Sequence, residues 1–481
     1  MTAMTPTVAD PALLDLAGMI EALAARKVSS VELTQACLAR IAAWQPVINA
    51  FIAIEPDEAL AAAREADTRL SGGAARGLLD GVPFAHKDMF YAKGKISTCG
   101  SKIRRDWVAD EDSTALLRLT ETGAIRLGTL NMAEFAYGPT GHNVHFGDAR
   151  NPWRPAHVTG GSSSGSGAAV AARLTPAALG SDTGGSVRMP ANFCGVTGLK
   201  TTVGRVSRFG AMPLSQSLDT VGPLATSALD CGLILGLIAG ADPRDPTASD
   251  VAVPDYAAAF DQDVRGMRLG VPSRFYTENL DPETEAVYQA ALDLFRQEGV
   301  EIVAIDLPDQ AVLSAASQVL LAAEGAAFHR QWLRERPQDY GDQVRARLEN
   351  GFAIPAVTYL ESLRYRGIAL AEHLAAVAGV DAFLAPVSAK ASPTLEESDV
   401  GGAPGAEAVI QQITRFMRPI NYLGLPALSV PSGFTRAGLP VGLQIVGRPF
   451  AEDVILRLGA GFQRASDFHR QIPSLPGAPD E

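Results

Sequence analysis

The chain has 481 residues, of which 47% are hydrophobic and 20% charged, so it is long enough to bury a large core and has a globular composition. Its 41 basic and 53 acidic residues give a formal net charge of −12, which disfavours binding to nucleic acid or to anionic membranes. The four cysteines (Cys37, Cys99, Cys194 and Cys231) include no CxxC pair, so we expect reduced core thiols, with neither a zinc site nor a disulfide framework.

The N-terminal segment has no basic residues ahead of its apolar ones, and no unbroken apolar run reaches about 18 residues. We therefore expect a cytoplasmic protein without a membrane span. The sequence leaves the oligomeric state open, and a homodimer is one of the states that it allows.

The predicted elements begin with helices over the first seventy residues. Apolar residues recur at helical spacing from Leu13 to Leu23, and Ser29 with Glu32 offers a capping box for a second helix. From Gly81 the pattern changes to short apolar strands that alternate with helices, which favours α/β layering. We expect one large domain, in which a helical scaffold (1–75) packs on the catalytic part (76–470) and a short tail (471–481) follows.

The later elements continue this alternation. We predict helices over 282–298, 315–336, 355–378 and 453–465, strands over 267–271, 381–386, 426–431 and 440–446, a hinge at 241–254 and a loop at 387–406. The functional site is expected where strands end.

Two glycine-serine clusters carry most of the functional signal. Ser162 and Ser186 each lie among glycines, which leave backbone N–H groups accessible to a ligand oxygen. A serine nucleophile needs a base and donors for the charge that builds on the attacked carbonyl oxygen. The N–H groups just before Ser186 could supply those donors. The competing interpretation is that both clusters are only turns or helix N-caps.

Lys87 is the candidate base, because it directly follows the apolar run Val82–Ala85. A lysine accepts a proton only when burial lowers its pKa from about 10.4. The competing interpretation pairs Lys87 with Asp88, although adjacent strand residues face opposite sides of a sheet.

A different nucleophile is also conceivable, because residues 161–165 satisfy the G-x-S-x-G pattern with Ser163 at its centre. That pattern requires a preceding apolar strand, whereas residues 154–159 contain a proline and are typical of a loop. The seven histidines (His86, His142, His145, His157, His329, His373 and His469) show no metal-ligand spacing, and we expect them in loops or at the surface. We expect no metal ion and no cofactor.

The combined motifs resemble the amidase signature family. The similarity lies in residues 82–88, 160–163, 180–188, 192–200, 218–223 and 419–427, and so covers nearly the whole chain. It implies a mixed β-sheet covered by helices on both faces. It also implies that Ser186 is the nucleophile, that Ser162 bridges on a cis peptide, that Lys87 is the terminal base, and that the N–H groups of Thr183, Gly184, Gly185 and Ser186 bind the oxyanion. Asp182 and Arg188 would brace the loop.

The resemblance implies a hydrolase of small carboxylic amides that forms an acyl-enzyme, a route that also admits esters and carbamates. The alternative is the A-type subunit of a tRNA-dependent amidotransferase, because residues 204–210 resemble those subunits. Such subunits carry an aspartate for the amino group of glutamine shortly before the late Pro-x-Asn motif, whereas residues 414–418 here read Thr-Arg-Phe-Met-Arg.

Specificity is expected from the segments 136–148, 208–217, 317–328 and 411–418. The candidate substrate-binding residues are Phe135, Tyr137, Phe209, Met212 and Phe416, which would form an apolar pocket for an aryl amide or carbamate.

Overall fold

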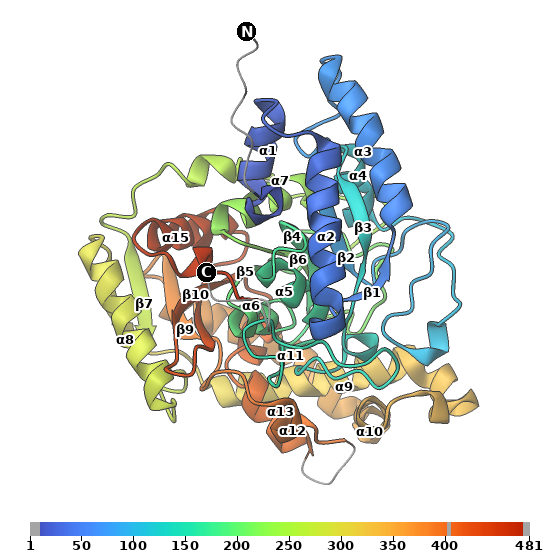
Figure 1. Ribbon diagram of the computed structural model, residues 1–481. Helices are drawn as coiled ribbons and strands as arrows, with labels where there is room; N and C mark the ends of the chain where they lie inside the picture. The colour runs from blue at the N-terminus through green and yellow to red at the C-terminus, as the bar shows by residue number, and fades with distance from the viewer. Residues whose placement is uncertain (1–9, 402–405, 475–481) are drawn as a thin grey trace.

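Eleven strands form one mixed β-sheet at the centre of the computed structural model, which describes residues 10–401 and 406–474 (Figure 1). The strands are β1 (Phe51–Ile54), β2 (Pro83–Lys87), β3 (Ile125–Leu130), β4 (Ala177–Asp182), β5 (Thr197–Lys200), β6 (Thr220–Ala225), β7 (Arg268–Pro272), β8 (Glu301–Ile305), β9 (Ala382–Pro386), β10 (Ala427–Phe434) and β11 (Pro440–Val446). Their spatial order is β1-β3-β2-β4-β6-β5-β10-β11-β9-β7-β8. The neighbours β2, β3 and β4 pair in parallel, β7 pairs in parallel with β8 and β9, and the other pairs are antiparallel.

Helices cover both faces of this sheet (Figure 1), which confirms the predicted fold class. They are α1 (Leu16–Ala24), α2 (Ser30–Ile48), α3 (Pro56–Ser71), α4 (Thr114–Glu121), α5 (Ser164–Ala171), α6 (Arg188–Cys194), α7 (Ala228–Ile238), α8 (Pro282–Gln297), α9 (Gln310–Glu335), α10 (Asp342–Asn350), α11 (Ala356–Ala376), α12 (Leu395–Ser398), α13 (Ala406–Thr414), α14 (Arg418–Leu423) and α15 (Glu452–Arg464).

Most predicted elements match, and the capping box at the start of α2 is present: Ser29 Oγ accepts from the Glu32 N–H and Glu32 accepts from the Ser29 N–H. The expectation of helices alone in the first seventy residues is wrong. The segment Phe51–Ile54 is β1, an edge strand that pairs antiparallel with β3. Four residues are too few for a period to be read, so sheet pairing determines their conformation. The N-terminal scaffold therefore contributes to the sheet itself.

The predicted hinge at 241–254 is held by hydrogen bonds. Asp242 accepts from Thr114 and Ser207, and Asp245 accepts from the backbone N–H of Arg208 at 2.7 Å. Aspartates that fix nearby backbone and hydroxyl groups give the connector a defined conformation. The predicted loop at 387–406 contains the short helix α12, and its residues 402–405 lie outside the described part of the chain, as do tail residues 475–481.

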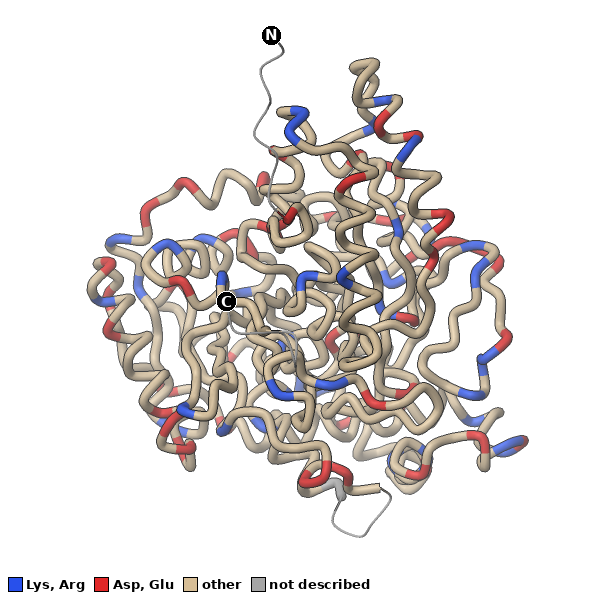
Figure 2. The backbone as a smooth tube through the Cα atoms, viewed as in Figure 1, with Lys and Arg blue, Asp and Glu red and all other residues tan. Residues whose placement is uncertain are grey.

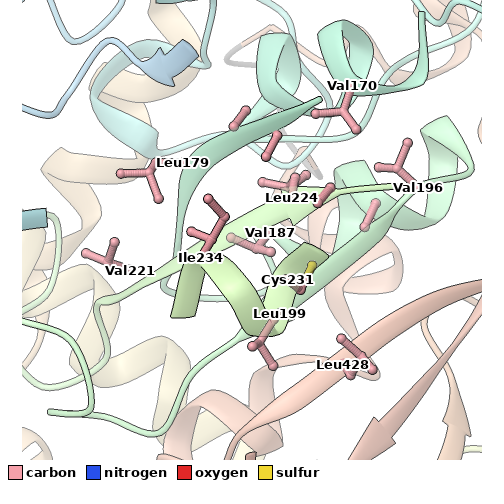
Figure 3. Packing of buried hydrophobic residues seen from close by; sticks show 14 of the residues in the cluster. Val170, Leu179, Val187, Val196, Leu199, Val221, Leu224, Cys231, Ile234 and Leu428 are labelled. Atoms are coloured by element: carbon pink, nitrogen blue, oxygen red, sulfur yellow. The ribbon is translucent and has the colours of Figure 1, made fainter. Parts of the chain in front are cut away.

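The centre of the core lies where β4, β5 and β6 meet α5 and α7. Leu179, Leu224 and Leu199 from the strands pack with Ile234 and Cys231 of α7 (Figure 3). All four cysteines are buried free thiols, as expected. This buried core fixes the ends of β2 and β4, which carry the site.

One described helix, α9, is long and apolar enough to cross a membrane by composition alone, although no unbroken apolar run marks it. Half of its apolar window is buried, and it packs against α10, α11 and α14, as a core helix does.

Lys and Arg residues are interspersed with Asp and Glu along the backbone trace (Figure 2).

Candidate active site

The sheet brings the predicted lysine and serines together. Strands β2 and β4 run in parallel as neighbours, so Lys87 at the end of β2 and Asp182 at the end of β4 lie at the same edge. The carboxyl ends of parallel strands are where ligands bind in open α/β sheets. The glycine-rich loop that leads to Ser186 starts at this edge.

Lys87 is completely buried and contacts two hydroxyls. Its Nζ lies 2.7 Å from Ser162 Oγ and 2.9 Å from Ser181 Oγ. The peptide bond between Gly161 and Ser162 is cis. Asp88 instead accepts from the N–H and hydroxyl of Thr98. The alternative pairing of Lys87 with Asp88 is therefore absent from the described structure.

The electrostatic environment of Lys87 favours its neutral form. Burial lowers the pKa of Lys87 to about 7, although the carboxylates of Asp219 and Asp182 act in the opposite direction. A lysine with a pKa near neutrality can act as a base at physiological pH.

Ser186 lines a pocket and lies next to the segment that contains Ser162 and Ser163. The backbone N–H of Ser163 donates to the Ser186 carbonyl at 3.3 Å, which holds the two serine segments against each other. Ser186 lines the pocket together with Gly161, Thr183, Gly184 and Gly185. Neither Ser162 nor Ser186 is a helix N-cap, because the N-cap residue of α5 is Ser163 and that of α6 is Val187.

The loop before Ser186 offers backbone donors. The N–H of Gly185 donates to Asp182 Oδ1 at 2.8 Å, so it already has an acceptor in this structure. Its predicted role as a donor to an oxyanion stays a prediction. Among the described residues, the N–H groups of Thr183, Gly184 and Ser186 have no protein acceptor.

Asp182 and Arg188 form a buried brace under this loop. Arg188 Nε and Nη2 lie 3.0 and 3.1 Å from the two Asp182 oxygens, and both side chains are fully buried. Arg188 also donates to Asn421 Oδ1 at 2.6 Å and to Gln444 Oε1 at 2.8 Å. The Arg188 guanidinium holds the pKa of Asp182 far below its usual range in spite of burial. This network connects the loop before Ser186 to the late Pro-x-Asn motif.

Arg188→Met is expected to destabilise the protein by about 3–5 kcal/mol, because it leaves the Asp182 carboxylate buried without its main partner. Urea unfolding measures this free energy. The matched control is Arg436→Met, which removes an exposed ion pair with Glu283 and should leave the free energy of unfolding nearly unchanged, because water screens such a pair. Similar losses in the two variants would contradict the proposed brace.

The structure gives no support to Ser163 as the nucleophile of a G-x-S-x-G turn. Residues 159–163 follow a loop, and Ser163 Oγ is fully buried and donates to the Ser181 carbonyl at 3.3 Å. The surface expectation for the histidines is wrong for His86, His329, His373 and His469, which are buried. Burial lowers the pKa of His86 and of His329 to about 3, because the core does not solvate an imidazolium.

Of the five candidate substrate-binding residues, only Tyr137 lines the pocket of Ser186. Phe135 is a core residue that stacks on Trp332 and contacts His329 and Tyr340. Phe416 packs against Phe275 and Tyr276. Phe135 and Phe416 therefore belong to aromatic clusters in the core. Their rings are less exposed to water there than they would be in an open pocket.

Phe209 and Met212 line a second cavity of about 360 Å³ that also reaches Ser181 and Asp219. The expected segments do supply Leu214, Leu321 and Thr414 to the Ser186 pocket. Sequence reasoning missed two pocket arginines. Arg418 lies within a predicted segment but was not singled out, and Arg347 lies on α10, whose pattern is that of an ordinary surface helix.

A buried lysine donates a hydrogen bond to a serine beside a glycine-rich loop at the edge of an α/β sheet. This arrangement defines a protein with a serine–lysine site. The family model described as Amidase matches residues 32–456, so the chain belongs to the amidase family.

Among its relatives, the A subunit of glutamyl-tRNA(Gln) amidotransferase from Geobacter metallireducens is 42% identical over 93% of this chain and 96% of the relative. The protein of that name from Roseiflexus sp. is 40% identical over 96% of this chain and 98% of the relative.

Solved structures are also similar to this chain. One of them is 34% identical, with a TM-score of 0.88 over 94% of this chain and 99% of that chain. Its description concerns a vestigial protein complex and the evolutionary origins of an s-triazine catabolic enzyme. The A subunit of glutamyl-tRNA(Gln) amidotransferase from Thermotoga maritima is 31% identical, with a TM-score of 0.79 over 94% of each chain.

Proposed function

We propose that the chain cleaves the C–N bond of a carboxylic amide through an acyl-enzyme on Ser186, with Ser162 and Lys87 as the proton relay. The observation that carries the proposal is the 2.7 Å contact between Lys87 Nζ and Ser162 Oγ beside the pocket that contains Ser186. A lysine whose pKa is lowered to about 7 by burial can accept the proton that Ser162 passes on.

In the proposed route, Ser186 Oγ bonds to the amide carbon while its proton moves to Ser162 Oγ and the proton of Ser162 moves to Lys87 Nζ. The N–H groups of Thr183, Gly184 and Ser186 stabilise the oxyanion. Ser162 then protonates the leaving nitrogen, the C–N bond breaks, and water releases the acyl group. The described structure has no hydrogen bond between the two serine hydroxyls, so the relay requires that this contact forms when the substrate binds.

The comparisons support the A-type amidotransferase chain better than the free-standing hydrolase that we expected first. Two relatives with that name align with this chain over 96% and 98% of their own length. Glutamine is then the ammonia donor, partner subunits are required, and a tRNA is the final acceptor. The exclusion of a nucleic acid partner from net charge alone does not hold for this candidate, since another subunit can supply the tRNA contact. A cytoplasmic location suits both candidates.

One observation favours the free-standing hydrolase. Thr414 and Arg418 line the pocket in the segment where we expect an amidotransferase subunit to carry an aspartate for the amino group of glutamine. Hydrolysis of esters or carbamates by the same acyl-enzyme belongs to this candidate.

Ammonia release from glutamine and from simple amides, with and without hydroxylamine, tests the proposal. Because an acyl-enzyme partitions between water and hydroxylamine, we expect a hydroxamate product. An active protein that gives no hydroxamate would contradict the acyl-enzyme. Glutamine-dependent conversion of glutamyl-tRNA(Gln), found only when a second subunit copurifies, would select the amidotransferase.

A further inference from the structure

The outer face of α11 presents large apolar side chains to solvent. Val357, Leu360 and Ile368 are 65%, 54% and 58% exposed. Because they lie at positions i, i+3 and i+11 of one helix, they share one side of it. Large apolar side chains that gather on an exposed face mark a contact surface, whereas scattered ones do not. The solvent-facing stripe of this helix, here called the α11 stripe, consists of Val357, Leu360, Glu361, Arg364, Gly367 and Ile368.

The opposite face of α11 attaches the helix to the rest of the protein. Ser362, Ala369 and His373 are buried on this inner face, and the helix packs on α9 and α14. Arg366 donates to the Ser217 carbonyl at 2.9 Å, and the hydroxyl of Tyr359 donates to Glu324 Oε1 at 2.9 Å. The fold thus holds α11 through its inner face, and the α11 stripe remains accessible from outside.

A glycine lies in the middle of the α11 stripe. Gly367 is an interior residue of a helix that runs from Ala356 to Ala376, and glycine weakens a helix at such a position. A methyl group at Gly367 would meet no atom of the described residues within 4 Å, apart from its chain neighbours and its own helix backbone. Packing within the chain therefore does not require a glycine here. A missing side chain does allow another backbone to approach closely.

Two opposite charges also lie on the α11 stripe. Glu361 and Arg364 are exposed, and neither makes an ion pair or a side-chain hydrogen bond with any residue that the structure describes. A second α11 that runs in the opposite direction places each Glu361 level with Arg364 of the other copy, so that two symmetric ion pairs form. A parallel copy would place identical charges level with each other. The charges therefore select an antiparallel copy of the same helix.

The same register matches the apolar residues. When Glu361 is level with Arg364 of the second copy, the two-fold axis passes between Ser362 and Leu363. Val357 is then level with Ile368 of the second copy. Leu360 lies near Gly367 of the second copy, where the missing side chain leaves room for it. The α11 stripe is complementary to itself in both charge and shape.

We propose that α11 is the contact helix of a two-fold symmetric homodimer, in which the α11 stripes of two copies pack antiparallel. Each contact then occurs twice, as in any isologous interface. One pair of helices buries less area than a standard protein–protein interface, so we expect a dissociation constant on the order of 1–10 μM. This inference does not depend on the reaction at Ser186.

Sedimentation velocity of the purified full chain, at concentrations below and above this dissociation constant, tests the proposal. We expect monomers at the low concentrations and dimers at the high ones. A chain that stays monomeric far above the expected dissociation constant would overturn the inference. The same holds if the chain stays monomeric and uses the α11 stripe to bind a different protein.

Charge reversal tests the register. Arg364→Glu and Glu361→Arg each place like charges level at two symmetric positions, so each should raise the dissociation constant about tenfold or more. The protein with both substitutions exchanges the charges and should return to nearly the wild-type value, which a folding defect would not do. The matched control is Arg64→Glu, an exposed position on α3, far from α11 in Figure 1. Failure of the double variant to dimerise, or an equal loss in the control, would contradict the antiparallel pairing.

Gly367→Gln tests the close approach of the two helices. Glutamine favours a helix more than glycine does, so the unfolding temperature should not fall, whereas its side chain fills the space that Leu360 of the second copy needs. We expect a folded monomer. Its kcat should equal that of the wild type, since α11 supplies none of the described residues that line the Ser186 pocket. A Gly367→Gln protein that dimerises as strongly as the wild type would show that the dimer uses another surface.

Discussion

Ser186→Ala is expected to abolish covalent labelling by a fluorophosphonate and to lower kcat by about 10⁴-fold or more, the scale seen when a serine nucleophile is removed. The reason is geometric. Ser186 lines the pocket and follows the N–H groups of Thr183 and Gly184, so an oxygen atom at this position can attack a carbonyl whose oxygen those groups hold. Intact-mass measurement and peptide mapping locate the label.

The control is Ser163→Ala, which removes a neighbouring hydroxyl bonded to the backbone of β4. We expect this variant to keep the label on Ser186, with a loss of stability of about 1 kcal/mol from the broken hydrogen bond. A label on Ser163 in the wild-type protein would exclude the proposed relay and restore the G-x-S-x-G interpretation.

The proximity of Lys87, Ser162 and Ser186 was predictable because each of these residues lies in a local signature. Glycines mark the loop before Ser186, and an apolar strand precedes Lys87. Local sequence also indicated which side Lys87 faces, since Asp88 lies on the opposite side of the strand and binds Thr98. The signals are strong because backbone conformation and burial at these positions depend on neighbours in the chain.

The walls of the pocket were harder to predict, because they depend on how distant helices pack. Arg347 on α10 reaches the pocket only because α10 packs on α9, which in turn contacts α14. Aromatic side chains were misassigned for a related reason: Phe135 and Phe416 are as suitable for a core as for a pocket, and their partners lie far away in the sequence. The sequence also does not show that Asp182 accepts a hydrogen bond from the N–H of Gly185, because that contact depends on how the loop folds back.

Lys87→Met is expected to lower kcat by about 10²–10⁴-fold, the usual contribution of a general base, and to remove the pH dependence that this base imposes. Burial lowers the pKa of Lys87 to about 7, so the neutral, active form accumulates as the pH rises through 7. The wild-type rate should be half-maximal near pH 7 and remain high under alkaline conditions. A bell-shaped profile centred near pH 6 would contradict this role.

Lys200→Met is the matched control. Lys200 is equally buried, and burial lowers its pKa to about 7 as well, but its Nζ donates to the carbonyls of Thr201 and Leu425 rather than to a serine. If Lys87 is the base, the Lys200 variant keeps the pH midpoint of the rate. A midpoint that moves in this variant and stays in Lys87→Met would assign the titration to the wrong lysine.

Lys87→Met should also raise the free energy of unfolding. This effect separates a catalytic role of Lys87 from a structural one. Because the pKa of Lys87 is about 7 in the folded protein and 10.5 as its ordinary value, the unfolded chain binds more protons between these two values. The stability of the wild-type protein therefore rises with pH across this window, and burial of Lys87 costs several kcal/mol at neutral pH. Lys87→Met removes that cost, so its unfolding free energy should exceed that of the wild type near pH 7, with the difference shrinking toward pH 10. A variant that is both inactive and less stable at pH 7 would indicate that Lys87 holds the serine cluster together as a cation and does not act as a base.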